Sequence, residues 1–139
     1  MQIPIFKPQT EWIPPTDFPD LGKYDEIAID LETKDPNLNK RMGSGSVVGE
    51  GDVVGVSLAT HDWCAYYPIA HEGGGNMDRK VVLKWLQDQL NTPATKIFHN
   101  AMYDVCWLRA LGLKINGTIV DTMIAASLID ENRFRYDLN

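Results

Sequence analysis

The chain has 139 residues, of which 44% are hydrophobic and 23% are charged, a balance typical of a globular protein of one domain. Its formal net charge of −6 excludes a global basic field, so any contact with nucleic acid needs metal ions and local basic loops. The sequence contains no apolar run of about 18 residues and no apolar signal core near its start, so we expect neither membrane insertion nor secretion.

The first segment, residues 1–23, contains five of the eight prolines, including Pro14 and Pro15, and shows no apolar periodicity. We expect a proline-rich, extended lead-in that packs locally through Trp12 and Phe18 or does not pack at all. The folded domain is then expected over residues 24–139.

The first expected strand, at about 26–32, runs from three apolar residues into Asp30 and Glu32. Residues two apart in a strand project to the same face, so these carboxylates would lie side by side. At about 5 Å they would repel by roughly 3 kcal/mol at an effective dielectric of about 20. A divalent metal held between them is one explanation. The alternative is a strand that ends in two solvated acids.

The remaining elements are expected to alternate after residues 34–52, which we interpret as a long flexible loop or an extended hairpin. Expected strands cover 53–59, 63–68, 96–98 and 119–120, and expected helices cover 79–91, 101–111 and 122–129. Asp78 and Asp121 precede helices as N-caps. This order predicts an α/β fold, in which an antiparallel meander and then βαβα units form one mixed sheet with helices on its faces.

The two cysteines, Cys64 and Cys106, are far apart and lack a metal-ligand spacing. Because both have hydrophobic neighbours, we expect buried free thiols rather than a disulfide. Free thiols suit a reducing compartment such as the cytoplasm.

A second chemically informative stretch begins at His99, directly after an expected strand, and opens a helix. Asn100 and Asp104 are four residues apart, so both can lie on one helical face at the end of that strand. By themselves, they are better explained as an N-cap and an exposed helical acid.

Together, Asp-x-Glu at a strand end and Asn-x-x-x-Asp at a strand-to-helix junction resemble the first two motifs of the DEDD 3′–5′ exonucleases. The surrounding stretches Ile-Phe-His-Asn-Ala-Met-Tyr-Asp and Ile-Val-Asp-Thr-Met-Ile-Ala-Ala-Ser-Leu are similar to the proofreading domain of phage-type family A DNA polymerases. The resemblance covers roughly residues 24–139 and implies an RNase H-like fold.

The resemblance implies that Asp30, Glu32 and Asp104 are the catalytic carboxylates and bind two Mg²⁺ or Mn²⁺ ions. It also implies that Leu31 and Asn100 position the substrate, the 3′ end of single-stranded DNA. The implied partner is a polymerase domain of the same or a parent chain, in the host cytoplasm if the gene is phage-encoded. Tyr103 could stack on a base or belong to the core.

The sequence departs from the family in its third motif, because no Tyr-x-x-x-Asp or His-x-x-x-Asp follows Asp104. We therefore expect a domain that is incomplete at its C-terminal end, with its fourth carboxylate beyond Asn139. Asp121 is interpreted as a cap or supporting residue rather than a metal ligand. The alternative function is a non-catalytic module that binds nucleic acid or packs against a polymerase.

We expect no direct role in catalysis for several neighbouring residues. His99 is expected to be a partly buried, hydrogen-bonded side chain rather than a ligand. The basic residues of the loop after Glu32 could contact phosphates or be solvated: Lys34, Lys40 and Arg41.

Overall fold

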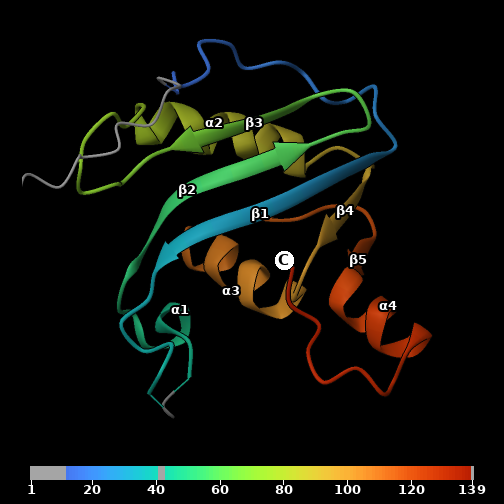
Figure 1. Cartoon of the computed structure of the whole chain (residues 1–139). Coiled ribbons are helices and arrows are strands. Elements are labelled where there is room, and N and C mark those ends of the chain that lie inside the picture. Colours follow the sequence, from blue (N-terminus) through green and yellow to red (C-terminus); the bar gives the residue numbers. More distant parts are fainter. Residues whose placement is uncertain (1–11, 41–42, 139) are drawn as a thin grey trace, which may run out of the picture.

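The computed structural model describes residues 12–40 and 43–138, and Figure 1 shows their arrangement. The strands are β1 (Glu26–Lys34), β2 (Asp52–Ala59), β3 (Cys64–Pro68), β4 (Thr95–Phe98) and β5 (Ile119–Asp121). The helices are α1 (Gly45–Val48), α2 (Arg79–Leu90), α3 (Ala101–Ala110) and α4 (Thr122–Ile129). Every predicted strand and helix is present, and α1 was not predicted.

The strands form one mixed sheet in the order β3-β2-β1-β4-β5. β1 and β2 pair antiparallel, as do β2 and β3, whereas β4 is parallel to both β1 and β5. The prediction of a meander followed by βαβα units is therefore confirmed.

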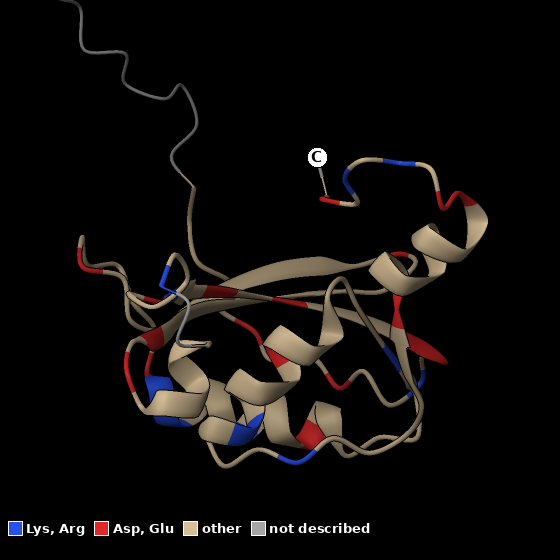
Figure 2. Ribbon diagram, turned by 90° about the horizontal axis from the view of Figure 1, so that it is seen from below, with Lys and Arg blue, Asp and Glu red and all other residues tan. Residues whose placement is uncertain are grey.

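The two faces of the sheet differ because β1 alternates strictly. Ile27, Ile29 and Leu31 are buried, while Asp30 and Glu32 are exposed on the other face. Apolar residues of α2 and α3 join the buried side in one core. In Figure 2, α4 and the last described residues of the chain lie on one side of the sheet, and the other helices lie on the opposite side. We call the side that carries Asp30 and Glu32 the open face.

The described residues of the long connection between β1 and β2 are organised around Asp35 and include the short helix α1, where a flexible loop or an extended hairpin was expected. The Asp35 carboxylate accepts hydrogen bonds from the backbone N–H of Asn37 (2.9 Å) and of Gly45 (3.0 and 3.1 Å to its two oxygens). It also accepts a hydrogen bond from the Tyr103 hydroxyl (3.1 Å). A Cβ at Gly45 would lie 2.1 Å from the Glu50 carbonyl oxygen, so only glycine fits there.

The lead-in contributes to the core through its second half. The Phe18 ring stacks on Tyr67 with centroids 5.5 Å apart, and the Leu21 side chain is only 1% exposed. Residues 1–11, the first part of the predicted lead-in, lie outside the described residues, as does Arg41.

The expectation of buried thiols is wrong for Cys64, which is exposed at the first position of β3, while Cys106 is half-buried. Both are free. Within 12–40 and 43–138, no helix is long and apolar enough to span a membrane.

Replacement of Asp35 by alanine should loosen the β1–β2 connection. The loss of this carboxylate acceptor is expected to cost about 1–2 kcal/mol of unfolding free energy, because the Gly45 and Asn37 N–H groups lose their partner. Denaturant unfolding and hydrogen exchange at residues 44–51 measure this. The matched control is Asp20→Ala, since Asp20 is exposed and accepts from the Gly22 N–H. Equal exchange in both variants would contradict the assignment.

Candidate active site

The two carboxylates of β1 lie side by side on the open face, as the strand alternation predicts. Both are exposed, and no ion pair within the described part of the chain involves either of them. Lys34, two residues further along β1, pairs with Glu72 instead. Among the described residues, no cationic side chain therefore compensates the charges of Asp30 and Glu32.

Leu31 separates the two acids, but its side chain faces the opposite way. It is 7% exposed and belongs to the core. Its side chain therefore does not lie on the open face, where the resemblance led us to expect contact with a nucleotide. The strict alternation of β1 is the physical reason, and the Leu31 backbone is what remains available there.

Asp104 lies on α3 and is 4% exposed. The chain passes from β4 into α3 within three residues, and β4 pairs with β1 only as far as Ala28. The N-terminal half of α3 can therefore lie near the part of β1 that carries the acids. The Oδ2 atom of Asp104 is buried and has no hydrogen-bond partner, so the predicted alternative of an exposed helical acid is wrong.

Burial and like charges together raise the pKa of Asp104 to about 7. Desolvation is the largest cause, and the charge of Asp30 is the next. Glu32 and Asp121 act in the same direction, while the Leu31 backbone N–H opposes the shift. The site therefore brings three predicted carboxylates within electrostatic reach of one another and holds one of them about half protonated near neutral pH.

Asp121 has the role of a cap, as predicted, and it serves two helices. Its carboxylate accepts from the backbone N–H of Asn100 (3.0 Å) and Ala101 (2.8 Å) at the start of α3. It also accepts from the Met123 N–H (2.9 Å) at the start of α4. Burial raises the pKa of Asp121, but these N–H donors outweigh it and the net shift is downward. Its charge is therefore satisfied by the backbone.

Asn100 occupies the N-cap position of α3 without using its side chain as a cap. Its φ of +63° is the only positive value among non-glycine residues of the described chain, a conformation that asparagine tolerates better than most residues. Asp121 caps the helix instead, so the exposed Asn100 amide takes no part in the cap.

Two further predicted residues are held by hydrogen bonds. His99 is partly buried and bonded to the Thr122 hydroxyl (2.9 Å) and to the Tyr136 carbonyl, which confirms the predicted role. The Tyr103 hydroxyl bonds to Thr33 (2.8 Å) and donates to Asp35. These bonds fix Tyr103 beside the C-terminal end of β1, and its stacking on a base stays a prediction.

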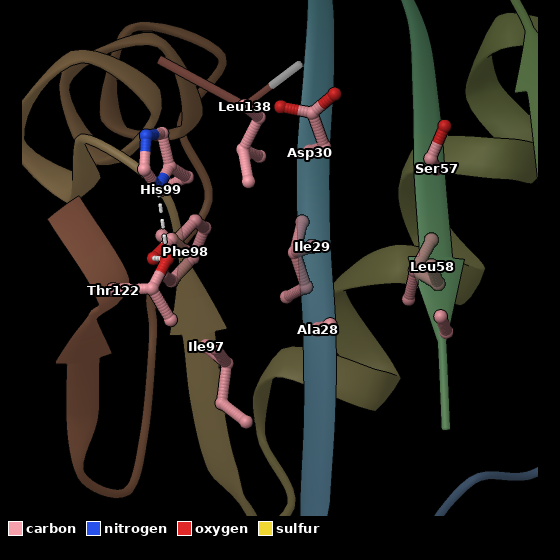
Figure 3. Close-up of a pocket in the computed structure, with 11 residues that line it drawn as sticks. Ala28, Ile29, Asp30, Ser57, Leu58, Ile97, Phe98, His99, Thr122 and Leu138 are labelled. Atoms are coloured by element: carbon pink, nitrogen blue, oxygen red, sulfur yellow. Dashed lines mark hydrogen bonds between the residues drawn. The ribbon is translucent and has the colours of Figure 1, made fainter. Parts of the chain in front are cut away.

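A small cavity of about 170 Å³ lies on the open face beside Asp30 (Figure 3). Figure 3 shows Asp30 and Ser57 on neighbouring strands, with His99 and Leu138 on the side toward β4. The cavity is shaped in part by the segment after α4, which returns across this region and ends next to it (Figure 1).

The carboxylates fit divalent metal ions in their chemistry. Hard oxygen ligands suit Mg²⁺ and Mn²⁺, and the unpartnered Oδ2 of Asp104 is a buried oxygen that still needs a positive partner. No group of three or more His, Cys, Asp or Glu side chains in residues 12–40 and 43–138 is already arranged as a metal site.

The sequence analysis missed Tyr66 as a neighbour of the site. A Cβ at Gly55 would lie 2.0 Å from the Tyr66 hydroxyl oxygen, so the ring lies directly over the Gly55 backbone. Gly55 is the cross-strand partner of Glu32. An isolated glycine inside a strand marks such a close approach and was the signal that could have identified it.

The raised pKa of Asp104 makes the metal-free protein less stable as pH rises. The unfolded chain releases this proton near pH 4 and the folded chain near pH 7, so stability is lost between these values. The loss is on the order of 4 kcal/mol, at 1.36 kcal/mol per pKa unit. Asp104→Asn should remove most of it, as measured by denaturant unfolding at pH 5 and pH 8 in EDTA. An identical pH slope in the wild type and the variant would contradict this assignment.

Comparison with known proteins finds an exonuclease family and several DNA polymerases among the relatives of this chain. The sequence profile of the 3′–5′ exonuclease family matches residues 18–139. A DNA-directed DNA polymerase of Pseudomonas phage M6 is 30% identical over 99% of this chain and 22% of its own length. DNA polymerase DpoZ of Acinetobacter phage SH-Ab 15497 is 33% identical over 88% of this chain and 17% of its own length. The chain thus spans about a fifth of these relatives.

Solved structures support the fold. Brucella melitensis NrnC superimposes with a TM-score of 0.57 at 23% identity, covering 86% of this chain and 51% of that one. The EXO domain of Aedes aegypti Nibbler gives 0.55 at 16% identity, covering 88% and 56%. These likenesses confirm the RNase H-like fold expected from the resemblance. With the profile covering most of the sequence, the chain belongs to the 3′–5′ exonuclease family.

Proposed function

We propose that this chain is a metal-dependent 3′–5′ exonuclease domain that removes nucleotides from single-stranded DNA ends beside a DNA polymerase. The observation that carries the proposal is the carboxylate site, in which Asp104 is buried with an unpartnered oxygen next to Asp30 and Glu32. The family membership of the chain supports the same reaction.

In this proposal, Asp30, Glu32 and Asp104 would hold the divalent ions, which would lower the pKa of the attacking water and relieve charge on the leaving oxygen. Asp104 would bind them in its ionised form, because a carboxylate ligand must be deprotonated. One NrnC structure carries bound Mg²⁺, which supports Mg²⁺ as the natural ion here.

The remaining residues orient the strand and the ligands. The exposed Asn100 amide, at the start of α3, and the Leu31 backbone, between the two acids of β1, would position the terminal nucleotide. Asp121 fixes the start of α3 by capping it, and so fixes the helix that carries Asp104. The polymerase relatives support a polymerase region, in the same or a parent chain, as the source of the 3′ end, in the host cytoplasm.

A second candidate is a module that binds single strands, or packs against a polymerase, without cutting. It is favoured by the finding that no group of three ligands is preassembled in the described part of the chain. One experiment distinguishes the two functions, because binding and shortening of a DNA strand are measured independently.

Conservative variants of the carboxylates test the reaction. With a 5′-labelled single strand and Mn²⁺, the wild type should shorten the strand from its 3′ end. Asp30→Asn and Asp104→Asn should each slow this by about 100-fold or more, a loss of about 3 kcal/mol of transition-state stabilisation. The matched control is Glu26→Gln, an exposed acid on the same face of β1, which should keep full activity.

Binding without shortening in the wild type would favour the second candidate. Equal rates of strand shortening in the Asp30→Asn variant and the Glu26→Gln control would show that the carboxylate site does not catalyse the reaction.

A further inference from the structure

A second, larger cavity of about 440 Å³ lies at the end of β3, on the open face. Its lining consists of aromatic rings, prolines and a glycine backbone: Trp12, Pro14, Tyr66, Pro68, His71 and residues 73–75. We call it the Trp12–Tyr66 cavity. Beta-carbon positions at the three glycines would meet no atom within 4 Å, so this wall is bare backbone next to open space.

Tyr66 lines the cavity and also lies near the carboxylates of β1. Ser57 lies opposite both Asp30 and Tyr66 in the sheet, so Tyr66 lies two strands from Asp30 on the same face. From there the Tyr66 ring lies over Gly55, the residue opposite Glu32. Burial and the charge of Glu32 both raise the pKa of Tyr66, which agrees with this placement.

The ring is held in place on several sides. Its hydroxyl is hydrogen-bonded to His71 Nε2, and the Trp12 ring lies 5.7 Å away at 53°. The His71 loop is itself closed by Asn76, which accepts from the His71 N–H (2.7 Å) and donates to the His71 carbonyl (2.8 Å). The Lys34–Glu72 ion pair joins this loop to the end of β1. The aromatic surface is therefore arranged before any ligand arrives.

The two cavities flank the acids differently. The smaller cavity, beside Asp30, is bounded by Leu138 and the returning C-terminal segment, so it suits the 3′ end of a DNA strand (Figure 3). The Trp12–Tyr66 cavity is more than twice as large, and the Trp12 side chain is 57% exposed at its edge. This larger cavity leaves room for the upstream part of a DNA strand.

We propose that the Trp12–Tyr66 cavity is a stacking subsite for one base of single-stranded DNA, upstream of the 3′-terminal nucleotide. The inference rests on the proposed function, since it takes the strand to have its terminal linkage at the carboxylates. Stacking on tyrosine and tryptophan is sequence-tolerant because every base has a π-face. The subsite would thus retain strands of any sequence during stepwise removal.

Binding of a labelled pentathymidylate with a cleavage-resistant 3′-terminal phosphorothioate tests the subsite, with Mg²⁺ present and fluorescence anisotropy as the readout. Tyr66→Leu should weaken binding by about 5-fold to 100-fold, the range that stacking of one base contributes. Binding of thymidine monophosphate, measured by competition, should not change. The matched control is Tyr24→Leu, because the Tyr24 hydroxyl is also hydrogen-bonded, to Asp62, away from the cavity.

An abasic scan along the strand identifies the stacked base. In the wild type, removal of one upstream base should weaken binding by the same factor as Tyr66→Leu. In Tyr66→Leu that removal should have no further effect. Gly55→Ala retains the tyrosine but displaces its ring, and should also abolish this coupling.

If the wild type binds and shortens strands but no abasic position is coupled to Tyr66, the subsite is wrong and the proposed function stands. If the wild type neither binds nor shortens any strand, the proposed function fails, and the subsite fails with it.

Discussion

The burial of Asp104 beside two other carboxylates is the constraint on which this site depends. A buried acid with an unpartnered oxygen is costly unless it takes up a proton or gains a positive partner. The neighbouring charges of Asp30 and Glu32 make ionisation harder still. No lysine or arginine of the described residues pairs with these acids, so a proton or a metal ion has to satisfy them.

Asp121 shows what the same residue type does when its charge is satisfied. It receives backbone N–H groups from the starts of two helices, and its pKa is lowered rather than raised. Asp121 therefore holds the scaffold, and Asp104 keeps its capacity for a ligand. The difference comes from placement, because Asp121 lies at the junction of β5 with α4 and Asp104 lies inside α3.

Local patterns in the sequence were sufficient to predict the strands, the helices and their N-caps Asp78 and Asp121, since these depend on neighbouring residues. The placement of Asp30 and Glu32 on the same face of the sheet follows from the two-residue period of a strand and was likewise predictable. The burial of Asp104 depends on where the fold places α3 relative to β1, so no local pattern gives it. The exposure of Cys64 was missed for a related reason, because it occupies β3, at one edge of the sheet.

Contacts between residues distant in sequence account for what the sequence did not reveal. Asp35 organises a glycine-rich loop by accepting hydrogen bonds from N–H donors that only the folded chain brings together. The Tyr66 ring can lie over position 55, opposite Glu32, because residue 55 has no side chain. Only the single glycine at position 55 signals this approach in the sequence, and its meaning depends on the strand register.

The most direct test is a titration of the Asp104 carboxyl carbon by NMR, in the metal-free protein and with saturating Mg²⁺. Without metal, the carboxyl should titrate with a pKa of about 7. With Mg²⁺, its apparent pKa should fall well below that value, because binding requires the ionised form. A metal-free pKa near the ordinary value of about 4, or a titration that Mg²⁺ does not change, would contradict the account.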